Sequence, residues 1–154
     1  MKKITLLLAL ILIYSLCFGQ IKKLEIPKKE LIGKIAPGGN STISIECYKY
    51  EDSTYLFRYL DAKFSRITEW KQFSIKSTED LNTLYSYLQN GFKEMPKENV
   101  LLDIGNGYLL LNFSKFLGGK VVRIYHSTTL DENGVVGYTN MYTVKQIDKL
   151  FGKE

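Results

Sequence analysis

The sequence predicts an α+β protein with a mainly antiparallel sheet of six to seven strands and two amphipathic helices. Three observations lead to this prediction. Apolar and polar residues alternate over several short segments, which is typical of half-buried strands. Two other segments repeat apolar residues at helical spacing. The connections between successive strands are short, so neighbouring strands should run antiparallel. The expected order of elements is β-β-β-α-β-β-β-(β)-α.

Three strands are expected in the first half of the domain. Residues 43–47 alternate cleanly and put Cys47 on the inward face. Residues 54–64 are dense in β-forming side chains and apolar on both faces, which fits a central strand. Residues 67–75 form the third strand, with Trp70 on the face opposite to its other large apolar side chains. A hairpin and a short loop would connect them.

The first helix follows directly. Ser77 and Asp80 resemble a capping box at its start, and Asn90-Gly91 predicts a left-handed stop at its end. Between them runs a single apolar stripe at helical spacing. Its members are Leu81, Leu84, Tyr85, Leu88 and Phe92.

The second half repeats this plan in outline. Strands are expected over 100–104, 108–113 and 121–128, with a short edge strand over 135–139. The chain then ends in a second helix, which Thr143 and Gln146 would cap and Gly152 would stop. A helix packed on each half of one curved sheet is the expected architecture.

The N-terminal segment 1–19 has the three-part layout of a signal peptide. Lys2 and Lys3 precede thirteen uncharged, mostly apolar residues, and a small residue, Gly19, closes the segment. Thirteen helical residues span roughly 20 Å, short of the ~30 Å hydrocarbon core of a bilayer. We therefore expect an exported protein, periplasmic or secreted, that does not span the membrane and is cleaved after Gly19. The alternative is a lipoprotein anchored through Cys17.

The positive charge lies in the segment after the signal peptide. Five lysines and two glutamates give residues 20–34 a net charge of +3, whereas residues 35–154 carry 14 basic and 14 acidic side chains. We divide the chain into the signal peptide (1–19), a basic arm (20–36) and one α+β domain (37–154). A neutral body argues against nucleic acid as a partner. The arm would make at most peripheral membrane contact, through Lys22, Lys23, Lys28 and Lys29.

Catalytic residues are hard to find in this sequence. His126 is the single histidine, and as a general base it would need an orienting partner, for which Asp103 on a nearby predicted strand is the candidate. Cys47 lies on an apolar strand face, where a thiol is usually inert. After cleavage it would be the only cysteine, so no internal disulfide can form.

No cofactor or metal site is expected. One histidine and scattered cysteines make no zinc spacing, and residues 131–134 lack the alternation of a calcium loop. Gly105-Asn106-Gly107 precedes a strand instead of the helix that a phosphate loop requires, so it should be a hairpin turn.

The surplus of tyrosine is the remaining unusual feature. Tyr48 and Tyr50 share the outward face of the first predicted strand, and Trp70 would extend an aromatic surface across the sheet. Aromatic rings give large contact area at low entropic cost, as binding surfaces do, although they also stabilise sheets by cross-strand pairing. We expect an exported, non-catalytic domain that binds a protein or cell-envelope polymer through this face. The alternatives are a small hydrolase using His126 with an acidic partner, and an inhibitor or immunity-type protein.

Overall fold

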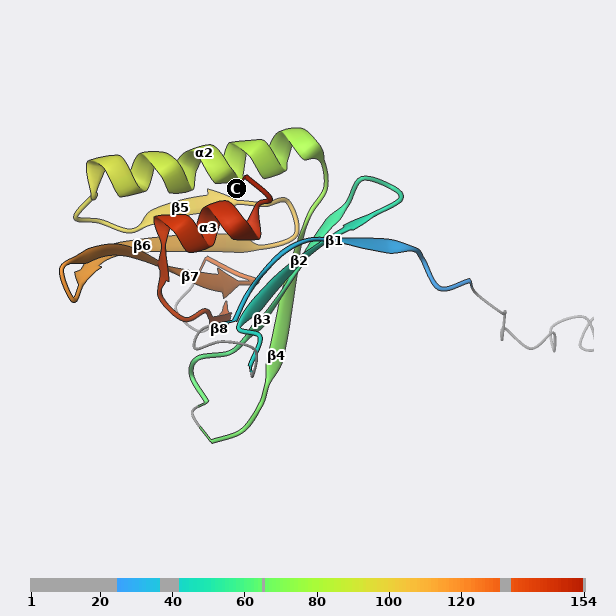
Figure 1. Cartoon of the computed structure of the whole chain (residues 1–154), viewed down its shortest axis with the longest axis horizontal. Coiled ribbons are helices and arrows are strands. Elements are labelled where there is room, and N and C mark those ends of the chain that lie inside the picture. Colours follow the sequence, from blue (N-terminus) through green and yellow to red (C-terminus); the bar gives the residue numbers. More distant parts are fainter. Residues whose placement is uncertain (1–24, 37–41, 65, 131–133, 154) are drawn as a thin grey trace, which may run out of the picture.

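The computed structural model describes residues 25–36, 42–64, 66–130 and 134–153. They form an α+β fold of two antiparallel sheets and two helices (Figure 1). The predicted signal peptide, with Cys17, lies outside the described residues, as do Lys22 and Lys23. No helix in the described ranges is long and apolar enough to cross a membrane.

The first sheet has four strands in sequential order. They are β1 (Lys29–Ile35), β2 (Ile45–Tyr50), β3 (Tyr55–Leu60) and β4 (Trp70–Ile75). The three predicted strands of this half are present, and Cys47 is fully buried as predicted. Strand β1 was not predicted, and its residues fall within the predicted basic arm (20–36). It pairs with β2 along its whole length, with a bulge between Leu31 and Gly33.

The second sheet has five strands. They are β5 (Val100–Asp103), β6 (Tyr108–Phe116), β7 (Gly119–Ser127), β8 (Val135–Tyr138) and β9 (Tyr142–Thr143), and both β8 and β9 pair with β7. The prediction of one curved sheet with six to seven strands is therefore wrong in count and arrangement. The connections between strands are short, as predicted. The length of a connection does not indicate where one sheet ends and the next begins.

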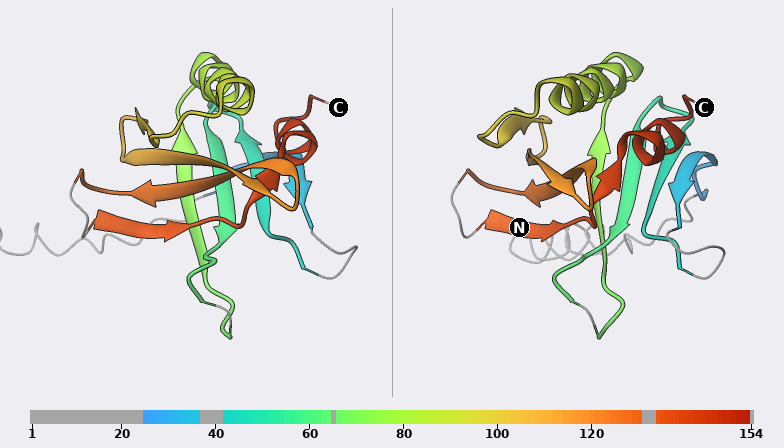
Figure 2. Two further views of the ribbon diagram at one scale, coloured as in Figure 1. Left: turned by 90° about the vertical axis from the view of Figure 1, so that its left-hand side faces the viewer. Right: turned by 60° about the vertical axis from the view of Figure 1, so that its left-hand side comes forward.

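The core lies between the two sheets, whose strands cross one another (Figure 2). The inner face of the first sheet contributes stacked rings, with the centroids of Phe57 and Phe73 4.9 Å apart. The second sheet contributes buried Leu109, Leu111 and Ile124. A buried hydrogen bond of 2.6 Å between the Ser44 and Tyr142 hydroxyls ties the two halves together.

Helix α2 (Thr78–Glu94) confirms the predicted cap and corrects the predicted stop. The Ser77 hydroxyl accepts the backbone N–H of Asp80 at 3.0 Å. The helix does not end at Gly91; it continues one more turn and ends at Met95, which adopts φ 50°. Gly91 is buried inside the helix because its Cα faces the Phe113 ring, where a Cβ would overlap ring atoms.

Helix α3 (Val144–Leu150) begins with the predicted capping box. The Gln146 side chain accepts the Thr143 N–H at 2.8 Å, and the Thr143 hydroxyl accepts the Gln146 N–H. The helix packs on β1 and β2, so close to β1 that a Cβ on Gly33 would lie 2.2 Å from the Lys149 carbonyl oxygen. The C-terminal helix and the strand from the predicted arm therefore hold each other in place.

Candidate functional site

One face of the first sheet is turned away from the core. Register fixes its members: Cys47, Phe57 and Phe73 align across β2, β3 and β4 on the inner side, so the residues between them point outward. Tyr48, Tyr50 and Trp70 all belong to this set. We call the set the outer face: Lys29, Leu31, Lys34, Glu46, Tyr48, Tyr50, Leu56, Arg58, Leu60, Trp70, Gln72 and Ser74.

Arg58 is at the centre of the outer face. Its guanidinium carbon lies 4.1 Å from the centroid of the Trp70 ring, a cation–π contact. Its Nη1 lies 3.8 Å from Oε2 of Glu46, the residue opposite it on β2. The Glu46 side chain is only 8% exposed, so this carboxylate depends on Arg58 for compensation of its charge. Trp70 and Glu46 thus hold Arg58 in one position.

Tyr48 extends this array toward β1. The Lys29 ammonium lies 4.0 Å from the centroid of the Tyr48 ring. Burial raises the pKa of Tyr48, and the neighbouring Glu46 carboxylate adds to the effect. The phenol is therefore a neutral hydrogen-bonding group throughout the physiological range. Of the arm lysines, Lys29 belongs to this face and Lys28 lies 4.0 Å from Glu51 at the surface.

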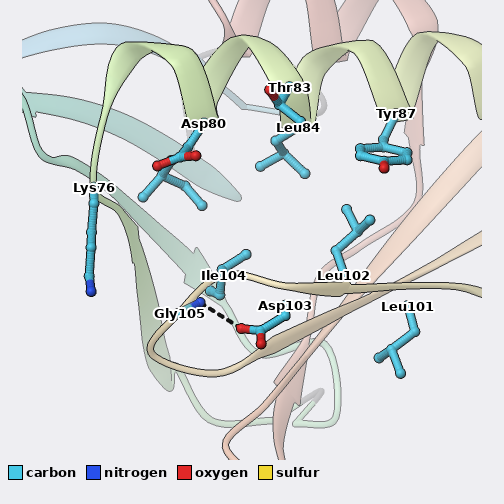
Figure 3. Close-up of a pocket in the computed structure, with 11 residues that line it drawn as sticks. Lys76, Asp80, Thr83, Leu84, Tyr87, Leu101, Leu102, Asp103, Ile104 and Gly105 are labelled. Carbon is cyan, nitrogen blue, oxygen red and sulfur yellow. Dashed lines mark hydrogen bonds between the residues drawn. The ribbon is translucent and has the colours of Figure 1, made fainter.

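A groove of about 650 Å³ lies between α2 and β5 (Figure 3). Leu84 and Tyr87 line it from the helix, and Leu102 and Ile104 from below. Its carboxylates already have local partners, because Asp80 accepts the Ser77 hydroxyl at 2.9 Å and Asp103 accepts the Gly105 N–H at 2.7 Å. No histidine or cysteine is among the residues that line the groove.

His126 and Asp103 are not brought together. His126 aligns with Leu109 and Leu102 across three strands, whereas Asp103 aligns with Tyr108 and Ser127. Adjacent positions point to opposite faces of a sheet, so His126 enters the core and Asp103 faces solvent. The structure therefore gives no support to this pair as a general base and its orienting acid.

His126 instead belongs to the core. It is 6% exposed, and its Nδ1 lies 3.5 Å from the Tyr59 hydroxyl. The Phe73 ring lies 5.6 Å away, centroid to centroid. Burial lowers the pKa of His126, which keeps the imidazole neutral. Cys47 is equally enclosed, and burial raises the pKa of its thiol to about 12, which makes it a poor nucleophile.

Two acids that were not predicted as site residues are buried: Glu46, described above, and Asp61. Asp61 lies at the end of β3. It is 3% exposed, and its Oδ1 accepts the backbone N–H groups of Lys63 and Tyr138 at 3.0 and 3.3 Å. Gly137 lies against this carboxylate so closely that a Cβ there would overlap it. The Asp-Ala-Lys sequence after a strand is a turn signal that would have indicated the first of these hydrogen bonds. Asp61 joins the β3–β4 loop to β8, a structural role.

In the part of the chain that the structure describes, no three histidine, cysteine, aspartate or glutamate side chains lie close enough together to hold a metal ion. Comparison with known proteins found no matching family model, curated protein or solved structure.

Proposed function

We propose that this protein is an exported, non-catalytic binding domain that contacts a protein or cell-envelope polymer through its outer face. The observation that carries the proposal is the ordered array of Glu46, Arg58 and Trp70, flanked by Tyr48 and Tyr50. Arginine, tryptophan and tyrosine are the residues that dominate binding energy at protein interfaces.

The array is suited to binding because it is already ordered. The planar Arg58 group is held between a ring and a carboxylate, so little side-chain entropy remains to be lost when a partner binds. Rings with two rotatable bonds add contact area at low entropic cost. No described helix covers this face, since α3 packs on the inner side of the same sheet and α2 packs on the second sheet.

The arrangement also favours a partner that offers hydrogen-bond acceptors and flat apolar surface. Lys29, Lys34 and Arg58 present donors, and the rings between them present apolar faces. Extended polypeptide and glycan chains both have this combination. Export of the chain, expected from residues 1–19, would bring the face into contact with both.

The test is a cross-linking pull-down from envelope extract with the tagged protein, read by mass spectrometry. We expect one dominant partner or polymer, and a loss on the order of a hundredfold in affinity when Tyr48, Tyr50 and Trp70 are all replaced by serine. Arg58 is kept in this variant, so that Glu46 is not left buried without its counter-charge.

A variant with the same chemical change elsewhere is the control. Tyr87→Ser combined with Phe64→Ser removes exposed rings from α2 and from the β3–β4 loop, and neither residue belongs to the outer face. It should bind as the wild type does. Circular dichroism and thermal melts establish that both variants are folded. Unchanged binding by the folded triple variant would show that the outer face is not the binding surface.

A further inference from the structure

The hairpin tip, residues Lys115–Lys120 between β6 and β7, exposes two adjacent apolar side chains. Leu117 is 92% exposed and Phe116 is 53% exposed. The tip lies at one end of the molecule, where the long β6–β7 hairpin extends past the body (Figure 1). No side chain of the described residues covers Leu117. No apolar contact among these residues therefore offsets the exposure of this side chain to water.

The backbone of the turn makes leucine a poor residue at this position. Leu117 has φ 48° and Gly118 has φ 79°, so both central residues of the turn are left-handed. Two-residue hairpin turns of this kind favour asparagine, aspartate or glycine at the first position, because the left-handed conformation brings the Cβ of other residues too close to the following carbonyl oxygen. Folding alone would select another residue.

The charges beside the apolar pair are also unfavourable to the isolated hairpin. Lys115 and Lys120 are directly opposite each other in the ladder, and like charges in that position repel. Residues 114–120 include no acidic side chain. The Lys120 ammonium donates to the Phe92 carbonyl at 2.6 Å, which fixes the hairpin against the end of α2. Lys115 is exposed.

We propose that the hairpin tip inserts into an anionic lipid surface. Phe116 and Leu117 would enter the boundary between headgroups and acyl chains, and the exposed Lys115, one step further from the turn, would lie among the lipid phosphates. This order of apolar tip and cationic flank matches the depth profile of a membrane interface. The same contact would offset the exposed apolar surface of Phe116 and Leu117. It is independent of the outer face, which belongs to the other sheet.

Leu117→Asn separates this role from a structural one. Asparagine suits the left-handed position, so the variant should melt at the same or a higher temperature than the wild type. It should nevertheless bind vesicles of phosphatidylcholine mixed with phosphatidylglycerol on the order of tenfold less tightly. Lys115→Gln should weaken binding to these vesicles about fivefold. It should leave binding to vesicles of phosphatidylcholine alone unchanged.

The assay is vesicle co-sedimentation of the chain as the producing cell releases it. All variants carry the same segment before Glu25, so any contribution of that segment to vesicle binding is common to them. Leu130→Asn, at a leucine 68% exposed in another loop, is the matched control and should bind as the wild type does. Equal binding by the wild type and Leu117→Asn would overturn the proposal, as would equal binding to both vesicle types. The proposal would also be overturned if the wild type did not bind vesicles and Leu117→Asn abolished binding to a protein partner. That result would indicate that Leu117 inserts into a pocket of a protein.

Discussion

Gly91→Ala should destabilise this protein even though alanine is the better helix former. At an exposed helical position the change would add roughly 1 kcal/mol of stability. Here the new Cβ would lie 2.0 Å from Cζ and 2.3 Å from Cε2 of Phe113, far inside the ~3.5–4 Å of normal carbon contact. Phe113 is 7% exposed and packs edge-on against Phe92, with centroids 5.4 Å apart, so its ring has little room to move.

The overlap decides the sign of the effect. Overpacking of a core costs about 1–3 kcal/mol, and an overlap of more than 1 Å belongs at the upper end of that range. Subtracting the gain in helix propensity leaves a net loss of about 2 kcal/mol, or a fall in Tm of about 8 °C for a domain of this size. Urea denaturation with linear extrapolation would measure it. Asn90→Ala, exposed on the same helix, is the control and should be neutral or slightly stabilising.

A double variant checks the mechanism. In a Phe113→Leu background the overlapping ring atoms are gone, so Gly91→Ala should lose most of its cost and become neutral or stabilising by up to about 1 kcal/mol. The reasoning is refuted if Gly91→Ala alone is as stable as the wild type. It is also refuted if the cost persists in full when Phe113 is replaced.

Two further predictions concern β1 and the core. Gly33→Ala would place a Cβ 2.2 and 2.6 Å from the carbonyl oxygens of Lys149 and Leu150, which are backbone atoms that no rotamer change can move. It should cost about 3 kcal/mol or more by urea denaturation, and a cost below about 1 kcal/mol would show that α3 is not seated on β1. Burial lowers the pKa of His126. Just below pH 6.5, this imidazole therefore binds a proton in the unfolded chain and remains neutral in the folded chain. Stability should be full above pH 6.5 and decline as the pH falls below it, by at most about 1.4 kcal/mol per pH unit for this group. His126→Gln should flatten the decline, and identical pH profiles for the two proteins would contradict this reading.

The elements that sequence could predict are those with local signals. The cap of α2 at Ser77 and the capping box of α3 at Thr143 depend on residues three positions apart, and both are present. The inward face of β2 followed from alternation alone, as the burial of Cys47 confirms. Strand β1 carried no comparable signal, because its lysines and glutamate resemble a solvated arm. It is a strand because β2 and α3 lie beside it.

The candidate site divides in the same way. Alternation predicted that Tyr48, Tyr50 and Trp70 point away from the core, and the register puts all three on one face. The role of Arg58 could not be predicted, since its contacts with Glu46 and Trp70 join three strands. Asp103 was a reasonable partner for His126 along the chain, but sheet register turned the two side chains to opposite faces.

The sequence by itself determined both helix starts, the strands other than β1, the antiparallel pairing and the charge distribution, because each depends on residues within a few positions of one another. Tertiary structure decided the division into two sheets, the continuation of α2 past Gly91 and the surroundings of His126. Each of these depends on contacts between residues far apart in the chain. Gly91 is the clearest case. The local sequence predicts that the helix ends there, whereas in the structure Gly91 lies inside the helix with the Phe113 ring packed against its Cα.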